Sequence, residues 1–202
     1  MTDVTFRRLQ RSDYSMLAGW LEQPHVKRWW NHDSTPEAIE ADFGACIDRV
    51  DLADIFIALW DGRPAGLIQS YLFGDNPGYM DEVSPLVNAS PEALSIDYFV
   101  GEPDLLRQGV GAAIIRALVD DIWRDYPAAP SVIVPVNAAN PASWRVLENA
   151  GFERVAEGPL SPDNPIDDWA HFVYRIRRPS DAAQRQPEAE EFPADAEGGQ
   201  SI

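Results

Sequence analysis

The chain has 202 residues, 45% of them hydrophobic, so it can bury one sizeable core and a single main domain is expected. Its formal net charge of −17 argues against nucleic acid or an anionic membrane as a partner, because both require clustered Lys and Arg. A single cysteine, Cys46, excludes an internal disulfide, and His32 and His171 lack partners at metal-ligand spacing, so no metal is expected. Without a long apolar run or an apolar leader, the chain is predicted to be cytoplasmic and to lack a membrane span.

The C-terminal segment differs in composition from the rest of the chain. Residues 179–202 hold six acidic residues and one arginine, which leaves a charge of −12 on residues 1–178. The segment is rich in Pro, Ala, Glu and Gly, so it cannot bury enough apolar surface to offset its chain entropy. We therefore predict one folded domain over 1–178 and a disordered acidic tail over 179–202.

The first half of the chain predicts a strand, two helices and a hairpin. Residues 4–9 have strand character and residues 12–23 have helical periodicity, with Ser12 as a cap. A second helix begins at "STPE", where a cap precedes Pro36 in the first turn. Two apolar strands flank Asp61-Gly62, a dipeptide typical of tight hairpin turns. The residues after this hairpin are predicted to form a loop.

The second half alternates strands and helices. A strand over 93–100 leads through a proline-broken loop to a helix over 109–126, and "SVIVPV" follows as a buried strand. "NPASWRVLENAGF" predicts a short helix with Asn140 as its cap and Gly151 as its end, and a last strand covers 171–176. This order predicts an α/β (mixed α+β) fold with one mixed sheet.

The glycine-rich turn before the long helix is a candidate anion site. Glycines let the backbone approach a ligand closely, and a helix N-terminus adds positive potential. The expected cradle is made of backbone amides, with added charge from Arg107; its residues are Gln108, Gly109, Val110, Gly111, Ala112 and Ala113. "GVG" is too short for a dinucleotide fingerprint and no Walker lysine follows it.

Together, "RQGVGAA" after a strand and "NPASWRVLENAGF" one strand later resemble the GNAT superfamily of acetyl-CoA-dependent N-acetyltransferases. The resemblance extends more faintly over residues 4–178. It implies a mostly antiparallel central sheet flanked by helices and splayed at the cofactor strand, with acetyl-CoA or another acyl-CoA as donor. By the same resemblance, the pantetheine arm would pair with the backbone of Phe99, Val100 and Gly101, and Asn140 would touch the cofactor.

Three further segments look like the aminoglycoside 6′-N-acetyltransferases: "LAGWLEQPHVKRWWN", "IQSYLFGDNPGYMDE" and "SIDYF". The first two are also similar to the siderophore-type lysine N-acyltransferases. The resemblance implies a small cationic amine as acceptor and a monomer or homodimer. Two alternatives remain open, a lysine-type N-acyltransferase and a catalytically inert CoA-binding or sensor domain.

Asp97 is the candidate catalytic residue. An alkylamine is mostly protonated at neutral pH, so a carboxylate must accept its proton before the amine can attack a thioester. Asp97 lies two residues before the expected pantetheine-pairing stretch, and an aspartate at the matching position serves as base in the aminoglycoside branch. The oxyanion is expected to meet a strand amide near Phe99 or Val100.

Aromatic and acidic residues supply the candidate acceptor site. Trp29 and Trp30 offer flat faces to a sugar ring or an alkylammonium, although one of the two is expected to pack in the core. Tyr71 follows on the hairpin, and Asp81 and Glu82, on the predicted loop, could bind amines or simply be solvated.

The chain departs from the family pattern at three positions. Leu106 replaces a usual Gln or Arg, Leu147 replaces a tyrosine that acts as general acid, and Pro135 replaces an acidic residue. Asn137 could replace the last as a polar contact but not as a charge. A thiolate can leave without a firm proton donor, so acyl transfer remains the leading prediction.

Overall fold

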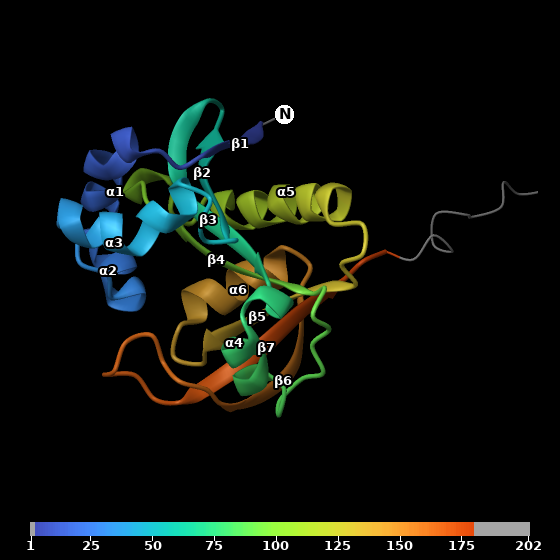
Figure 1. The fold of residues 1–202 in the computed structure, drawn as a ribbon. Coiled ribbons are helices and arrows are strands. Elements are labelled where there is room, and N and C mark those ends of the chain that lie inside the picture. The colour runs from blue at the N-terminus through green and yellow to red at the C-terminus, as the bar shows by residue number, and fades with distance from the viewer. Residues whose placement is uncertain (1–2, 180–202) are drawn as a thin grey trace, which may run out of the picture.

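The computed structural model describes residues 3–179, so the tail predicted over 179–202 lies outside the described residues except for Pro179. One seven-stranded sheet with the order β1-β2-β3-β4-β5-β7-β6 forms the centre of the molecule (Figure 1). All neighbouring pairs are antiparallel except β4 and β5. The strands are β1 Val4–Arg8, β2 Asp54–Trp60, β3 Arg63–Leu72, β4 Leu94–Val100, β5 Ser131–Asn137, β6 Glu153–Pro159 and β7 Ala170–Arg177.

Helices cover both faces of this sheet. The helices are α1 Tyr14–Leu21, α2 Pro24–Trp30, α3 Pro36–Ile47, α4 Pro77–Val83, α5 Val110–Asp125 and α6 Pro141–Asn149. The first three pack on the face that carries Leu67 and Phe99, whereas α5 and α6 pack on the face that carries Ile68 and Ile96. None of the helices among residues 3–179 is long and apolar enough to cross a membrane.

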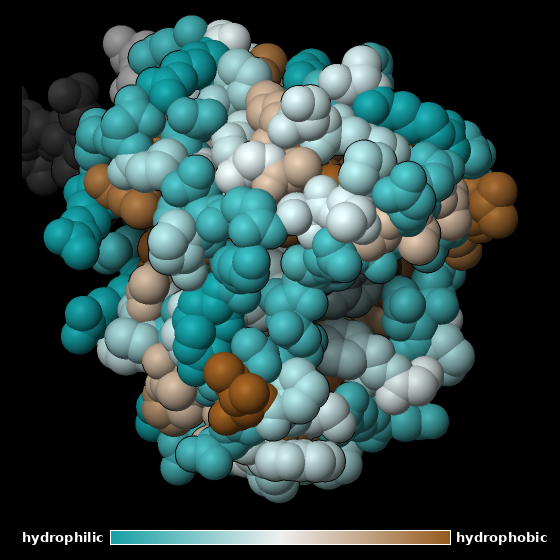
Figure 2. All heavy atoms as spheres, turned by 90° about the vertical axis from the view of Figure 1, so that its left-hand side faces the viewer, coloured by the Kyte–Doolittle hydropathy of each residue, from teal (hydrophilic) through white to brown (hydrophobic). Residues whose placement is uncertain are grey.

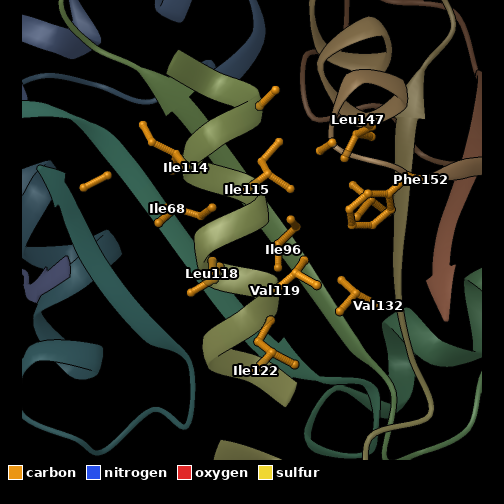
Figure 3. Packing of buried hydrophobic residues seen from close by; sticks show 14 of the residues in the cluster. Ile68, Ile96, Ile114, Ile115, Leu118, Val119, Ile122, Val132, Leu147 and Phe152 are labelled. Carbon is orange, nitrogen blue, oxygen red and sulfur yellow. The ribbon is translucent and has the colours of Figure 1, made fainter. Parts of the chain in front are cut away.

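The main core lies between α5 and the sheet. Apolar residues recur on one face of α5 and meet Ile68 of β3, Ile96 of β4 and Val132 of β5 (Figure 3). Leu147 of α6 and Phe152 close the other side of this layer, and Leu147 has no exposed surface. Burial of this apolar layer fixes α5 across the middle of the sheet.

The sheet splits where β4 and β5 run parallel. The two strands share one register pair, Leu94 with Val132, and separate beyond it. By contrast, β4 stays paired with β3 along its whole length, from Leu94 to Val100. The splay predicted for the cofactor strand is therefore present.

The mixed, mostly antiparallel fold is confirmed, and several local predictions need correction. The hairpin turn has φ of 50° at Asp61 and 78° at Gly62, as a two-residue turn requires. The predicted helix over 12–23 is shorter, because Ser12 lies in a 3-10 turn before α1. The sequence reading also missed α2, β6 and α4, and the last of these replaces the loop predicted to carry Asp81 and Glu82.

Candidate active site

A cleft of about 790 Å³ opens where β4 and β5 separate. One half is lined by the loop before α5, the first turn of α5 and α6, and we call it the cofactor half. The other half, the acceptor half, is lined by α2, β4 and the loop between β6 and β7. Figure 2 looks onto this side of the molecule and shows a largely hydrophilic surface with a shaded recess near its middle.

The first turn of α5 presents backbone amides to the cofactor half. Gly109 has φ of 80° and lines the cleft with Val110, Gly111 and Ala112. The first bond inside the helix runs from Ala113 N–H to Gly109 C=O, at 3.1 Å, so the amides of residues 110–112 have no partner within the helix. Ala113 therefore drops out of the predicted set of anion-binding amides, because its N–H is hydrogen-bonded within the helix.

Three residues predicted to hold the cofactor do not line the cleft. They are Gly101, Gln108 and Ala113. The side chain of Gln108 donates to the Asp104 carbonyl. Gly101 donates its N–H to Ala65 of β3, at 2.8 Å, and lies under Trp20, where a Cβ would come within 2.3 Å of the ring. Gly101 therefore allows Trp20 to pack closely on the backbone, and its N–H is not free to bind a ligand. Arg107, with φ of 62°, does line the cleft.

Of the three residues predicted to pair with the pantetheine arm, Val100 is the one whose backbone groups face the cleft. Its carbonyl accepts a hydrogen bond from Nε2 of His25, at 2.8 Å, on the edge away from β3. A strand residue directs its N–H and C=O to the same side, so the Val100 N–H faces this edge too. Phe99 instead pairs with Leu67 of β3, and its ring packs against Trp20 and Trp30. Of the two predicted amides, the geometry favours Val100.

The N-terminus of α6 forms the opposite wall of the cofactor half. Asn140 lines the cleft and caps α6, since its Oδ1 accepts from Ser143 N–H at 3.1 Å. The Tyr98 hydroxyl from β4 hydrogen-bonds the Ser143 hydroxyl at 2.8 Å and so fastens β4 to α6 across the splay. Leu147 is enclosed in the core, so this position contributes nothing to the cleft.

Asp97 stands at the junction of the two halves. It is half-buried on β4, lines the cleft, and its Oδ2 accepts from Nε2 of Gln69, at 2.8 Å. Burial raises the pKa of Asp97 above its usual value, the Gln69 hydrogen bond lowers it, and the charge of Asp163 raises it further. Such a carboxylate is a stronger base than a solvated one.

The two tryptophans line the acceptor half but are already in contact with protein groups. Trp30 meets Phe99 edge to face, with ring centroids 4.7 Å apart, and belongs partly to the core under α1–α3. The Arg28 guanidinium lies 4.1 Å from the Trp29 ring centroid and covers one face of that ring. One face of Trp29 at most is therefore available to a ligand.

The other predicted acceptor residues lie outside the cleft lining. Tyr71 lies on β3, two residues after Gln69, which is the register partner of Asp97. Burial is the larger cause and the charge of Asp97 the second, and together they raise the pKa of the Tyr71 hydroxyl well above its usual value. Glu82 of α4 accepts from Ser161 N–H, at 2.6 Å, and so holds the β6–β7 loop. Asp81, also on α4, is exposed to solvent.

Sequence reasoning missed the carboxylates of the β6–β7 loop. Asp163 and Asp167 line the acceptor half, and Asp167 is paired with Arg28 of α2. Partial burial raises the pKa of Asp163, and the nearby charge of His171 opposes that shift. The sequence of this loop has no motif or periodicity that would predict a role for them, because the contact with α2 is what brings the loop to the site. Among residues 3–179 no group of three or more His, Cys, Asp or Glu could hold a metal ion.

The sequence profile of the acetyltransferase (GNAT) domain matches residues 10–160. The chain belongs to the GNAT acetyltransferase family. It is accordingly an acyl-CoA-dependent N-acetyltransferase, and its co-substrate is acetyl-CoA. The cofactor half fits such a molecule, with free amides for an anionic group at the α5 turn and a free strand edge at Val100 for an extended amide arm.

Relatives within the family act on different amines. The chain is 28% identical over 167 residues to the aminoglycoside N(6′)-acetyltransferase type 1 of Klebsiella pneumoniae, covering 80% of this chain and 79% of that protein. It is 22% identical over 151 residues to the lysine N-acyltransferase MbtK of Mycobacterium tuberculosis, covering 75% and 69%. The structure of aminoglycoside acetyltransferase AAC(6′)-Ib with coenzyme A and kanamycin matches with a TM-score of 0.75 at 25% identity, covering 91% and 99%.

Proposed function

We propose that this enzyme acetylates a primary amine of a polycationic small molecule, as an aminoglycoside 6′-type N-acetyltransferase, and so supports aminoglycoside resistance. The observation that carries the proposal is the charge of the acceptor half. Asp97 and Asp163 line it and have no Lys or Arg partner among residues 3–179, and Asp167, which also lines it, is paired with Arg28. The arginines of the described residues that line the cleft, Arg107 and Arg145, lie beside α5 and on α6 in the cofactor half. Carboxylates that are not paired with a Lys or Arg attract ammonium groups.

Asp97 acts as the base in this proposal. Bound acetyl-CoA supplies an acyl group activated as a thioester. Asp97 attracts the ammonium form of the acceptor and accepts its proton, directly or through water, and Gln69 holds the carboxylate in place. The neutral amine then attacks the thioester carbonyl, so that one N–C bond forms and one C–S bond breaks with its electron pair on sulfur. The second proton of the nitrogen is lost to water as the amide forms.

Val100 and the α5 turn support the acyl donor. We assign the Val100 N–H, on the free edge of β4, as the donor to a developing oxyanion. The unpaired amides of residues 110–112 and the side chain of Arg107 suit an anionic group of the donor. With Leu147 buried, the thiolate leaves without a proton donor at that position.

The lysine-type alternative is less well supported by the site. An amino-acid acceptor carries a carboxylate. No Lys or Arg among residues 3–179 lines the acceptor half, and Arg28 of α2 is already paired with Asp167. A longer acyl chain would need an apolar channel beside Trp29 and Trp30, where Arg28 and Phe99 already pack.

A thiol-release assay tests the proposal. Acetyl-CoA and longer acyl-CoAs are combined with kanamycin, spermidine and N-acetyl-lysine amide, and we expect turnover with acetyl-CoA and kanamycin. Asp97→Asn preserves the acceptor oxygen for Gln69 but removes the charge, and it should lower kcat by about 10²–10⁴-fold. Full activity of Asp97→Asn would refute the base assignment. Binding of acetyl-CoA without turnover of any amine would favour the sensor alternative.

A further inference from the structure

His171 is a buried imidazole in the acceptor half that the proposed mechanism does not use. It is the second residue of β7, lines the cleft and is only 8% exposed. The imidazole lies near enough to Asp163 for a charge on it to lower the pKa of that carboxyl, so it belongs to the same acidic half of the cleft. A polar ring at such a place either packs there for structural reasons or contacts the ligand.

The hydrogen bonds of His171 determine which nitrogen is available. Nδ1 lies 2.9 Å from the carbonyl of Trp169, and a carbonyl only accepts, so Nδ1 carries a hydrogen and donates. In the neutral imidazole Nε2 then carries the lone pair. Nε2 has no hydrogen-bond partner among residues 3–179. It is also not fully buried, since the buried side-chain atoms without a partner in this part of the chain are Ser95 Oγ, Trp144 Nε1 and Arg175 Nε. Nε2 is thus open to the cleft.

The neighbouring polar residue at this end of the sheet is already satisfied. Asn137 of β5 lies directly opposite His171 in the β5–β7 ladder. Its Nδ2 donates to the Asp168 carbonyl at 2.8 Å, and its Oδ1 accepts from Ala139 N–H at 3.0 Å. Both polar groups of Asn137 therefore hold the turn, whereas Nε2 of His171 has no hydrogen-bond partner among the described residues.

We propose that His171 is an acceptor-binding residue that determines specificity: its Nε2 lone pair accepts a hydrogen from an N–H or O–H group of the amine substrate. A group of this kind selects a polyfunctional acceptor, with a second donor besides the reacting amine, over a simple alkylamine. The inference rests on the proposed function, since it concerns the acceptor of the same reaction.

Two substitutions separate binding from structure. His171→Asn retains a donor at the Nδ1 position for the Trp169 carbonyl but has no atom at the Nε2 position. His171→Phe retains the ring and has no polar atom. We expect both to raise the KM for kanamycin about tenfold, the effect of one lost hydrogen bond, with kcat and the KM for acetyl-CoA within about twofold. His171→Gln, which carries an oxygen near the Nε2 position, should restore most of the affinity.

The control is Tyr126→Phe, which removes a hydrogen bond to Asp54 at a residue that does not line the cleft. It should leave the KM for kanamycin unchanged, and a simple alkylamine, propylamine, should respond little to any His171 variant. A wild-type KM for kanamycin in His171→Asn would overturn the inference while leaving the proposed function intact, as would equal losses for kanamycin and propylamine. Absence of turnover by the unmodified enzyme with every amine would instead refute the proposed function. If His171→Phe fails to fold, His171→Asn alone decides.

Discussion

Gln69→Leu is expected to shift the pH dependence of acetyl transfer without removing a catalytic group. The Gln69 amide donates to Asp97 Oδ2 at 2.8 Å and lowers the pKa of that carboxyl. A hydrogen bond to a charged group is worth about 1.5–3 kcal/mol. Since about 1.4 kcal/mol corresponds to one pH unit, the acidic limb of kcat/KM for the acceptor should move up by about 1–2 pH units. Above that limb, where Asp97 is ionised, the rate should approach that of the unmodified enzyme.

The measurement is kcat/KM for kanamycin from pH 5 to 9, for the unmodified enzyme and for Gln69→Leu. The control is the same substitution in an Asp97→Asn background, where no carboxylate remains and Gln69→Leu should change the residual rate little. An acidic limb that stays in place while the upper plateau falls would refute the reasoning, because Gln69 would then act on the substrate rather than through Asp97.

Three further outcomes follow from backbone and core geometry. Gly109→Ala should weaken acetyl-CoA binding about tenfold, as measured by calorimetry, and lower the free energy of unfolding by about 1 kcal/mol or more, because φ is 80° there. The control is Gly62→Ala, at φ of 78° in the hairpin, which should lower the free energy of unfolding by a similar amount and leave binding unchanged. Leu147→Tyr should lower the free energy of unfolding in urea by about 1–3 kcal/mol, since the site is enclosed, and a gain in kcat would contradict this. Asp97→Asn should raise the thermal midpoint at pH 7. Burial raises the folded-state pKa of Asp97, so its destabilising effect is absent below the unfolded pKa near 3.8, grows as pH rises towards the folded pKa, and is complete above it. An unchanged midpoint at pH 7 would count against that burial.

Local signals were sufficient to predict much of the fold. The Asp61-Gly62 turn and the Asn140 cap before Pro141 depend on neighbouring residues alone, so they are legible in sequence. Strand β6 was missed because its side chains are mostly exposed and lack an apolar alternation. The helices α2 and α4 have seven residues each, too few to show a helical period, although each begins with a proline in its first turn.

The acceptor site could be predicted only in part. Asp97 could be predicted because a carboxylate inside an apolar strand is unusual. Its partner Gln69 could not, because it lies 28 positions away and only the β3–β4 register brings the two side chains together. Asp163 and His171 reach the cleft through the course of the β6–β7 loop and the strand order, which no local pattern encodes. For the same reason the sequence placed Asp81 and Glu82 near a ligand, whereas Glu82 holds that loop.

The seam between β4 and β5 makes the sheet two half-sheets that share one register pair of the backbone ladder, Leu94 with Val132. What sets their separation is therefore mainly the layer of apolar side chains beneath, where α5 spans both halves (Figure 3). The width of the cleft therefore depends on the volume of side chains in this layer, such as Ile115 and Val119, which do not line the cleft. Substitutions in that layer are therefore expected to change the width of the cleft without altering any residue that lines it.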